Sequence, residues 1–402
     1  MFRFPRSLTL AVIAAFLMKV VVALTTHGST DVIIFEADVT KLERDGVVAL
    51  YRDGISTEWC GREGSRSCPP FNHPPFMARV LEAWAFLGQL SGLPMRFWLR
   101  LSCAIADAGS VALLARILRR HLGEARARPA LLWFALSPIS ILVSGFHGNT
   151  DPIWLFLALL AIDLLEERRP VWLVGAAVGA AMSIKIVPVL LIPVVVLSLP
   201  PVRHRVAFGT GLAGTFLVGS LPVLLQAPTL VGMRVFGYSS QSGSWGLSLL
   251  SVVLEARPAL AWLGEAYLRY GKGLSLALVL GASLWPRPRL DTVFFHAGLV
   301  MLLFLSVIPG FGVQYLVWPV PWVVALGSRV TALYFTAATA LLVAYYSTAA
   351  GTFPWYLANS LARPAWTVPV ILLGLACWIV VCAITLRYGR RLAAERLVAR
   401  SA

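Results

Sequence analysis

Four polar clusters interrupt a largely apolar sequence, and the first of them offers carboxylates. Asp31 stands where an apolar run gives way to a polar stretch, and Glu36 and Asp38 follow closely. A carboxylate at such a boundary can serve as a general base that removes a proton from a hydroxyl group. The alternative is that these acids are solvated loop residues. Asp31 is singled out because it lies at the boundary of the apolar run.

The second cluster, Phe71–Phe76, places Asn72 and His73 directly before two prolines. Because proline rings fix the backbone, both polar side chains would be held at the start of the following helix. They could bind a substrate there, or they could simply belong to a helix N-terminus.

The third cluster is a polar turn between two apolar segments, in which His147, Asn149 and Asp151 fall within five residues. Imidazole, amide and carboxylate groups so close together could bind a metal ion or a sugar hydroxyl. A short turn also uses Asn and Asp for its geometry and for helix capping. His147 is the member of the cluster that turn chemistry does not explain.

The fourth cluster is a single cation, Lys185, which lies between two short apolar segments and far in sequence from other charges. A bound anion such as a phosphate would account for its position. Two later segments add Gln241, and Gln314 with Tyr315, whose amide, hydroxyl and aromatic groups suit contacts with sugars or lipid headgroups. Aromatic residues also gather at membrane interfaces, so a purely structural interpretation of Tyr315 stays open.

These clusters lie in a chain whose composition requires a lipid environment. Hydrophobic residues make up 58% of the 402 positions and charged residues 13%, whereas soluble domains carry about 25% charged residues. Long apolar runs recur without period-two alternation, which favours membrane-spanning α-helices over a β-barrel. We therefore predict an all-α, polytopic transmembrane bundle of about 10–13 spans.

Basic residues cluster in short segments between the apolar runs, which is the pattern that retains loops in the cytoplasm. The net charge of +15 is therefore attributed to membrane topology and not to nucleic acid binding. Both termini are predicted to lie inside. The first apolar run, Leu8–Leu24, is interpreted as a membrane helix rather than a cleaved signal peptide.

A single membrane domain, 1–402, is the simplest organisation, because the sequence shows no convincing internal repeat. Two stretches within it, 25–75 and 227–270, are predicted extracytoplasmic loops, and helical spacing of apolar residues over 32–50 predicts a surface helix in the first. Cys60 and Cys68 could form a disulfide in that loop. The short apolar segments between 170 and 199 predict broken helices.

Motifs of soluble enzymes do not occur in the sequence: there is no Walker loop, zinc-protease histidine pair or nucleophile elbow. An ATP-driven pump is therefore not expected. A secondary transporter or lipid flippase is the main alternative, since carriers also combine broken helices with buried polar residues. A carrier would hold its polar site near the membrane midplane, whereas the clusters described above are predicted to gather at one surface.

At these clusters the sequence resembles the GT-C superfamily of polytopic glycosyltransferases, which includes enzymes that take mannose or glucose from a polyprenyl phosphate. The resemblance covers roughly residues 1–325. Its elements, in chain order, are the acid after the first span, Gly46–Tyr51, Phe71–Phe76, the His-Gly-Asn-x-Asp turn, Ile184–Pro188 and Val313–Trp318.

The resemblance implies that Asp31 is the catalytic base. The paired Asp-x-Asp of the superfamily is absent at this position, and His73 stands where a tyrosine is more usual. Glu36 or Asp38 could therefore hold the role of the base instead. The residues expected to bind the donor or the acceptor are Asn72, His73, His147, Asn149, Asp151, Lys185, Gln241, Gln314 and Tyr315.

The resemblance further implies an inverting transfer of a hexose, in the first place mannose, from a polyprenyl-phosphate donor to a lipid, glycan or protein acceptor on the extracytoplasmic side. Lys185, or alternatively Arg234 or Arg257, would neutralise the departing lipid phosphate, so neither a cofactor nor an obligatory metal is expected. The expected setting is a bacterial plasma membrane, with membrane lipid as the remaining partner.

Overall fold

The structure, a computed structural model, describes residues 5–55, 71–238, 240–255, 257–284 and 288–401. Its regular structure is almost entirely helical, so the prediction of an all-α polytopic fold is confirmed. The described strands are two short ones, β1 (Gly28–Ser29) and β2 (Leu357–Ala358), which pair in parallel. Cys60 and Cys68 lie outside the described residues, so their disulfide stays a prediction.

Within the described residues, seven helices are long and apolar enough to cross a membrane. They are α1 (Arg6–Thr25), α5 (Met95–Leu122), the combined α6, α7 and η1 (Glu124–His147), α11 (Val202–Gln226), η3 with α15 (Leu290–Val307), α17 (Ser328–Ala350) and the first part of α18 (Val368–Ser401).

The seven long helices are fewer than the 10–13 predicted spans, because several apolar runs form short helices. These shorter apolar helices are α9 (Val171–Ile184), η2 with α10 (Val187–Ser198), α13 (Gly246–Glu255) and η4 to η5 (Val313–Leu326). Prolines inside the runs explain much of the shortening, since each removes a backbone donor. The break between α9 and η2 confirms the prediction of broken helices there.

Two further helices complete the bundle, namely α8 (Asp151–Glu166) and α14 (Ala261–Leu284). Because α14 already begins at Ala261, the last part of the predicted second loop, 227–270, belongs to a long helix. The remainder of that stretch contains α12 (Pro228–Phe236) and α13.

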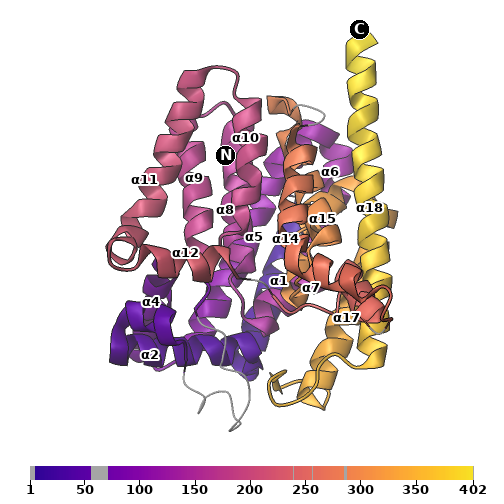
Figure 1. Ribbon diagram of the computed structural model, residues 1–402. Coiled ribbons are helices and arrows are strands. Elements are labelled where there is room, and N and C mark those ends of the chain that lie inside the picture. Colours follow the sequence, from indigo (N-terminus) through magenta and orange to yellow (C-terminus); the bar gives the residue numbers. More distant parts are fainter. Residues whose placement is uncertain (1–4, 56–70, 239, 256, 285–287, 402) are drawn as a thin grey trace.

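Helix α2 (Thr30–Asp53) lies across one end of the bundle, while the chain ends point toward the opposite side (Figure 1). The predicted surface helix is therefore present, although Gly46 interrupts it with a φ of 80° that favours glycine. Its buried side includes Phe35 and Leu42, and Glu43 on another side is exposed. Helix α4 (Pro75–Ser91) packs beside α2.

Glycines allow α9 and α11 to pack in close contact. A Cβ atom on Gly175 would lie 2.0 Å from the Phe208 carbonyl oxygen, and one on Gly211 would lie 2.0 Å from the Trp172 carbonyl oxygen. Small residues permit such backbone approach between membrane helices. The pair forms one flank of the bundle, next to α4.

Candidate active site

The site is organised around the first turn of α2, where Asp31 follows the capping residue Ser29. The Ser29 hydroxyl accepts a hydrogen bond from the Asp31 backbone N–H at 3.2 Å and donates one to the His147 carbonyl at 2.7 Å. One serine therefore caps α2 and joins it to η1, a π-helix over Ile141–His147. π-Helical turns of this kind occur frequently at functional sites.

Three side chains converge on one oxygen of the Asp31 carboxylate. His147 Nε2 lies 3.1 Å from Asp31 Oδ2, Asn149 Nδ2 donates to the same oxygen, and Gln314 Nε2 lies 3.4 Å away. Because a carboxylate only accepts hydrogen bonds, His147 must carry a proton on Nε2, and in the neutral ring Nδ1 accepts from the Tyr346 hydroxyl at 2.9 Å. The second carboxylate oxygen, Oδ1, is left without a hydrogen bond from these side chains.

These neighbours keep Asp31 ionised. Removal from water acts to raise the pKa of the carboxyl group, but His147, Asn149 and Lys185 outweigh it and lower the pKa to about 2. Asp31 is therefore a carboxylate throughout the neutral range.

Lys185 supplies the positive charge of the site. Its Nζ donates to Asp151 Oδ1 at 2.7 Å and to Asn149 Oδ1 at 3.2 Å, and it lies 5.3 Å from the ring centre of Tyr315. Asp151 is fully buried, and Trp154 Nε1 also donates to its Oδ1. Since an ammonium group has three N–H donors, one donor of Lys185 remains for a ligand.

A cavity of about 100 Å³ joins the carboxylate and the ammonium group. The residues lining it come from α2, the segment before α4, the turn before α8, the α9–η2 break, the segment after α12, and η4. They are Asp31, Ile34, Phe35, Asp38, Phe71, Asn72, His73, Asn149, Lys185, Tyr238, Gln314 and Tyr315.

His73 is held in the cavity wall as a neutral ring. Its Nδ1 lies 3.3 Å from the Ile184 carbonyl oxygen, to which it donates, and its own carbonyl accepts from the Tyr51 hydroxyl. Burial, aided by the charge of Lys185, lowers the pKa of His73 to about 4. His73 therefore links the start of α4 to the residue that precedes Lys185.

The structure thus brings together most of the residues singled out from the sequence, and it places others elsewhere. Glu36 lies on another side of α2, where it pairs with Arg96 at 3.0 Å and with His27 at 3.3 Å. Gln241 is exposed and accepts a hydrogen bond from Trp366 Nε1 at 3.1 Å. Arg234 donates to the carbonyl oxygens of Tyr51 and Arg52 and is absent from the cavity lining.

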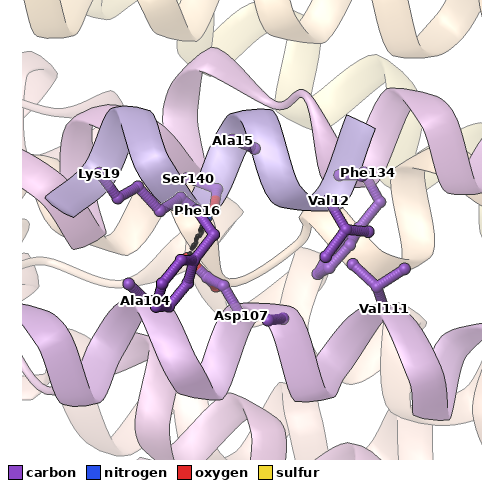
Figure 2. Close-up of a pocket in the computed structure, with 11 residues that line it drawn as sticks. Val12, Ala15, Phe16, Lys19, Ala104, Asp107, Val111, Phe134 and Ser140 are labelled. Carbon is purple, nitrogen blue, oxygen red and sulfur yellow. Dashed lines mark hydrogen bonds and ion pairs between the residues drawn. The ribbon is translucent and has the colours of Figure 1, made fainter. Parts of the chain in front are cut away.

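A second buried polar cluster, which the sequence analysis did not identify, holds the π-helix in place. Lys19 Nζ lies 2.8 Å from Asp107 Oδ2 and 2.8 Å from Ser140 Oγ, and Ser144 of η1 also donates to Asp107. Figure 2 shows Lys19 and Ser140 turned toward Asp107 between α1 and α5. The cluster anchors η1 three residues before His147.

Arg100 anchors the other side of the same π-helix. Its guanidinium group is fully buried and donates to the carbonyl oxygens of Ala23 and Thr26 at 2.8 Å, at the end of α1. A further N–H donates to the Gly145 carbonyl oxygen at 3.4 Å. Lys19, Asp107 and Arg100 could have been flagged by the rule that selected Lys185, because each is an ionisable residue in an apolar helix.

Metal binding is not evident in this geometry. In the part of the chain that the structure describes, no three His, Cys, Asp or Glu side chains are grouped so as to hold a metal ion. Among the described cysteines, Cys103, Cys377 and Cys382 are free.

Comparison with known proteins adds to this geometry. Residues 72–230 match the family model described as dolichyl-phosphate-mannose-protein mannosyltransferase. Among solved structures, the fold matches the crystal structure of ArnT from Cupriavidus metallidurans bound to undecaprenyl phosphate, with a TM-score of 0.53 at 14% sequence identity. That match covers 95% of this chain and 77% of the other. No curated protein gives a significant match.

The helical architecture and the position of the site define a polytopic membrane protein with the GT-C fold. The family model over residues 72–230 matches less than half of the chain, and it agrees with this fold. The fold that the sequence resemblance implied is therefore confirmed.

The Lys19–Asp107 pair gives a testable prediction about stability. Replacing Lys19 by Met leaves Asp107 without its cation in the membrane interior, and we expect the free energy of unfolding to fall by about 3–5 kcal/mol. The midpoint of thermal unfolding in detergent micelles measures the loss.

Leu17→Met is the matched control, because Leu17 lies on the same helix and is 55% exposed. Adding Asp107→Asn to Lys19→Met removes the uncompensated charge and should restore much of the stability. A Lys19→Met protein as stable as the Leu17→Met control would contradict the importance of the pair.

Proposed function

We propose that this protein is a glycosyltransferase that moves a hexose from a polyprenyl-phosphate donor to an acceptor hydroxyl by a single inverting displacement. The observation that carries the proposal is the shared cavity, which places the ionised Asp31 and the ammonium group of Lys185 around one space. The Asp31 carboxylate can accept the proton of the attacking hydroxyl, and the Lys185 ammonium group can bind the departing phosphate.

The attacking side of the reaction needs a proton acceptor. The Asp31 oxygen that receives no hydrogen bond from His147 or Asn149 is free to accept the acceptor O–H. A pKa of about 2 makes this carboxylate a weak base. That strength suffices because a hydroxyl becomes strongly acidic once its oxygen bonds to an anomeric carbon with oxocarbenium character.

The leaving side needs positive charge. As the bond between the anomeric carbon and the phosphate oxygen breaks, its electron pair stays on the phosphate. Lys185 offers its remaining N–H donor to that oxygen, while Asp151 and Asn149 fix the ammonium group through the other two. The products are the glycosylated acceptor and the polyprenyl phosphate, and Asp31 then releases its proton to water.

A lipid tail also has a suitable place beside the site. An apolar groove of about 560 Å³ runs between α4, α9 and α11, with Phe76, Trp172, Ala180, Ser183, Gly214 and Val218 among its lining residues. Ser183 is two residues from Lys185, and Phe76 is three residues from His73. A polyprenyl chain in this groove would bring its phosphate to the cavity.

Mannose is the hexose that we propose, because the matching family model is described by dolichyl-phosphate-mannose. The solved structure with the same fold was obtained with undecaprenyl phosphate, which supports a polyprenyl carrier for the sugar. The acceptor is a hydroxyl of a lipid, glycan or protein.

We place the site on the extracytoplasmic side of a bacterial plasma membrane. Arg116, Arg119 and Arg120 lie at the end of α5 remote from α2, and the chain ends point the same way (Figure 1). Basic residues collect on the cytoplasmic side of membrane proteins. The end that carries α2 and the cavity would then face outside.

Replacing Asp31 by Asn tests the base directly. The amide cannot take the proton, so we expect sugar transfer to fall by about 10²- to 10⁴-fold. The assay uses purified protein in liposomes with radiolabelled polyprenyl-phosphate mannose and a membrane extract as the acceptor pool.

Asp45→Asn, an exposed acid on the same helix, serves as the control and should keep full activity. Full activity of a folded Asp31→Asn protein would remove Asp31 from the mechanism. If the wild-type protein transfers sugar from no polyprenyl-phosphate donor, the proposed function itself is wrong.

The role of His147 predicts a change in pH dependence. His147→Phe keeps the ring volume but removes the group that most lowers the pKa of Asp31, so burial raises that pKa from about 2. A base loses activity as the pH falls through its pKa. We therefore expect the acid limb of kcat/KM to move upward by about one to three pH units.

The free energy of unfolding depends on pH in the same direction. The low pKa of Asp31 stabilises the folded protein above about pH 4, and this contribution is lost as the pH falls toward 2. An acid limb that is unchanged in His147→Phe would show that His147 does not tune Asp31.

A further inference from the structure

A second acid of the cavity, Asp38, has no role in the mechanism described so far. Its side chain is 2% exposed and lines the same cavity as Asp31 and Lys185. No hydrogen bond or ion pair to Asp38 occurs among the described residues, in contrast to the paired Glu36 on the same helix. A buried acid without a protein partner is costly unless a ligand or a proton compensates it.

The position of Asp38 relative to the reacting atoms is set by the helix. Asp38 is seven positions after Asp31, which corresponds to two turns and about 10 Å along α2. Both acids therefore project from the same face of α2 into the cavity. Between them the cavity wall is aromatic and apolar, formed in part by Phe35 and Phe71. The space between the two acids suits a sugar ring.

The two acids differ in their pKa values. Burial raises the pKa of Asp38 to about 8, whereas that of Asp31 is about 2. The titratable or charged groups that face this part of the cavity from α2 and from the elements around it are Asp31, Tyr51, His73, Lys185, Tyr238 and Tyr315. None of them forms an ion pair with Asp38, so burial favours the protonated form of its carboxyl group.

We propose that Asp38 binds a hydroxyl group of a sugar ring as a neutral carboxylic acid, at the end of the cavity opposite the catalytic base. A protonated carboxyl group offers one O–H donor and a carbonyl acceptor, and a sugar hydroxyl is itself both donor and acceptor. Asp38 is thus a specificity-determining residue and not an alternative base. This inference rests on the proposed function, because it assumes that a sugar occupies the cavity.

The pH profile of the wild-type protein is the first test. As the pH rises through about 8, Asp38 loses its proton and its donor, and the new negative charge lies in the cavity that would also receive the donor phosphate. We expect kcat/KM for transfer to fall along an alkaline limb near that pH. Asp38→Asn keeps an N–H donor that does not titrate, so it should retain activity within a few fold at pH 7 and lose this limb.

Asp38→Leu completes the test by removing the donor while filling the space. We expect KM to rise about tenfold, the effect of losing one hydrogen bond to a substrate hydroxyl, with kcat changed less. Separate titrations of donor and acceptor show which sugar Asp38 contacts, according to which KM rises. Glu43→Gln, an exposed acid on the same helix, is the control and should match the wild type.

Two results would overturn the inference while leaving the proposed function intact. An Asp38→Asn protein with the unfolding midpoint of the wild type, but with activity as low as that of Asp31→Asn, would show that Asp38 acts in its ionised form. Wild-type KM values and an unchanged alkaline limb in both Asp38 variants would show that it contacts no substrate. Absence of transfer by the wild-type protein would instead contradict the proposed function.

Discussion

The hydrogen bond between His147 and Asp31 is the interaction on which the site depends, because it joins two segments that lie 116 residues apart in the chain. Other contacts hold each of the two segments in place. Ser29 caps the helix that carries Asp31, and the β1–β2 pair ties that helix start to the segment after α17. The π-helix that ends at His147 is held by Asp107 from one side and by Arg100 from the other.

This arrangement explains how one cavity contains groups of different charge. Asp31 is surrounded by donors and stays ionised, whereas Asp38 receives no hydrogen bond from the described residues and its burial favours the protonated form. Lys185 shares its charge with the buried Asp151, so it can stay in the protein interior when no phosphate is bound. Environments that push the pKa values of neighbouring acids apart are a recurrent basis for assigning separate roles to them.

Much of the architecture could be predicted from the sequence, because apolar runs in a bilayer must form helices. The polar clusters were also visible, since an ionisable residue beside an apolar run is costly without a function. What could not be predicted is the partner of each acid: Glu36 pairs with Arg96 and His27, whereas Asp38 has no such partner among the described residues. Among the described residues seven helices are long enough to span a membrane, and several other apolar runs form shorter helices. Gln241 lies outside the cavity lining, and the Trp366 that donates to it is distant in sequence.

The most direct test of the account is the anomeric configuration of the product, determined by nuclear magnetic resonance after transfer from a donor of known configuration. One carboxylate base, one attacking hydroxyl and one departing phosphate around a single cavity require one displacement at the anomeric carbon. The account predicts a product of inverted configuration. A product that retains the donor configuration would contradict it, because Asp31 would then have to act as a nucleophile in two successive displacements.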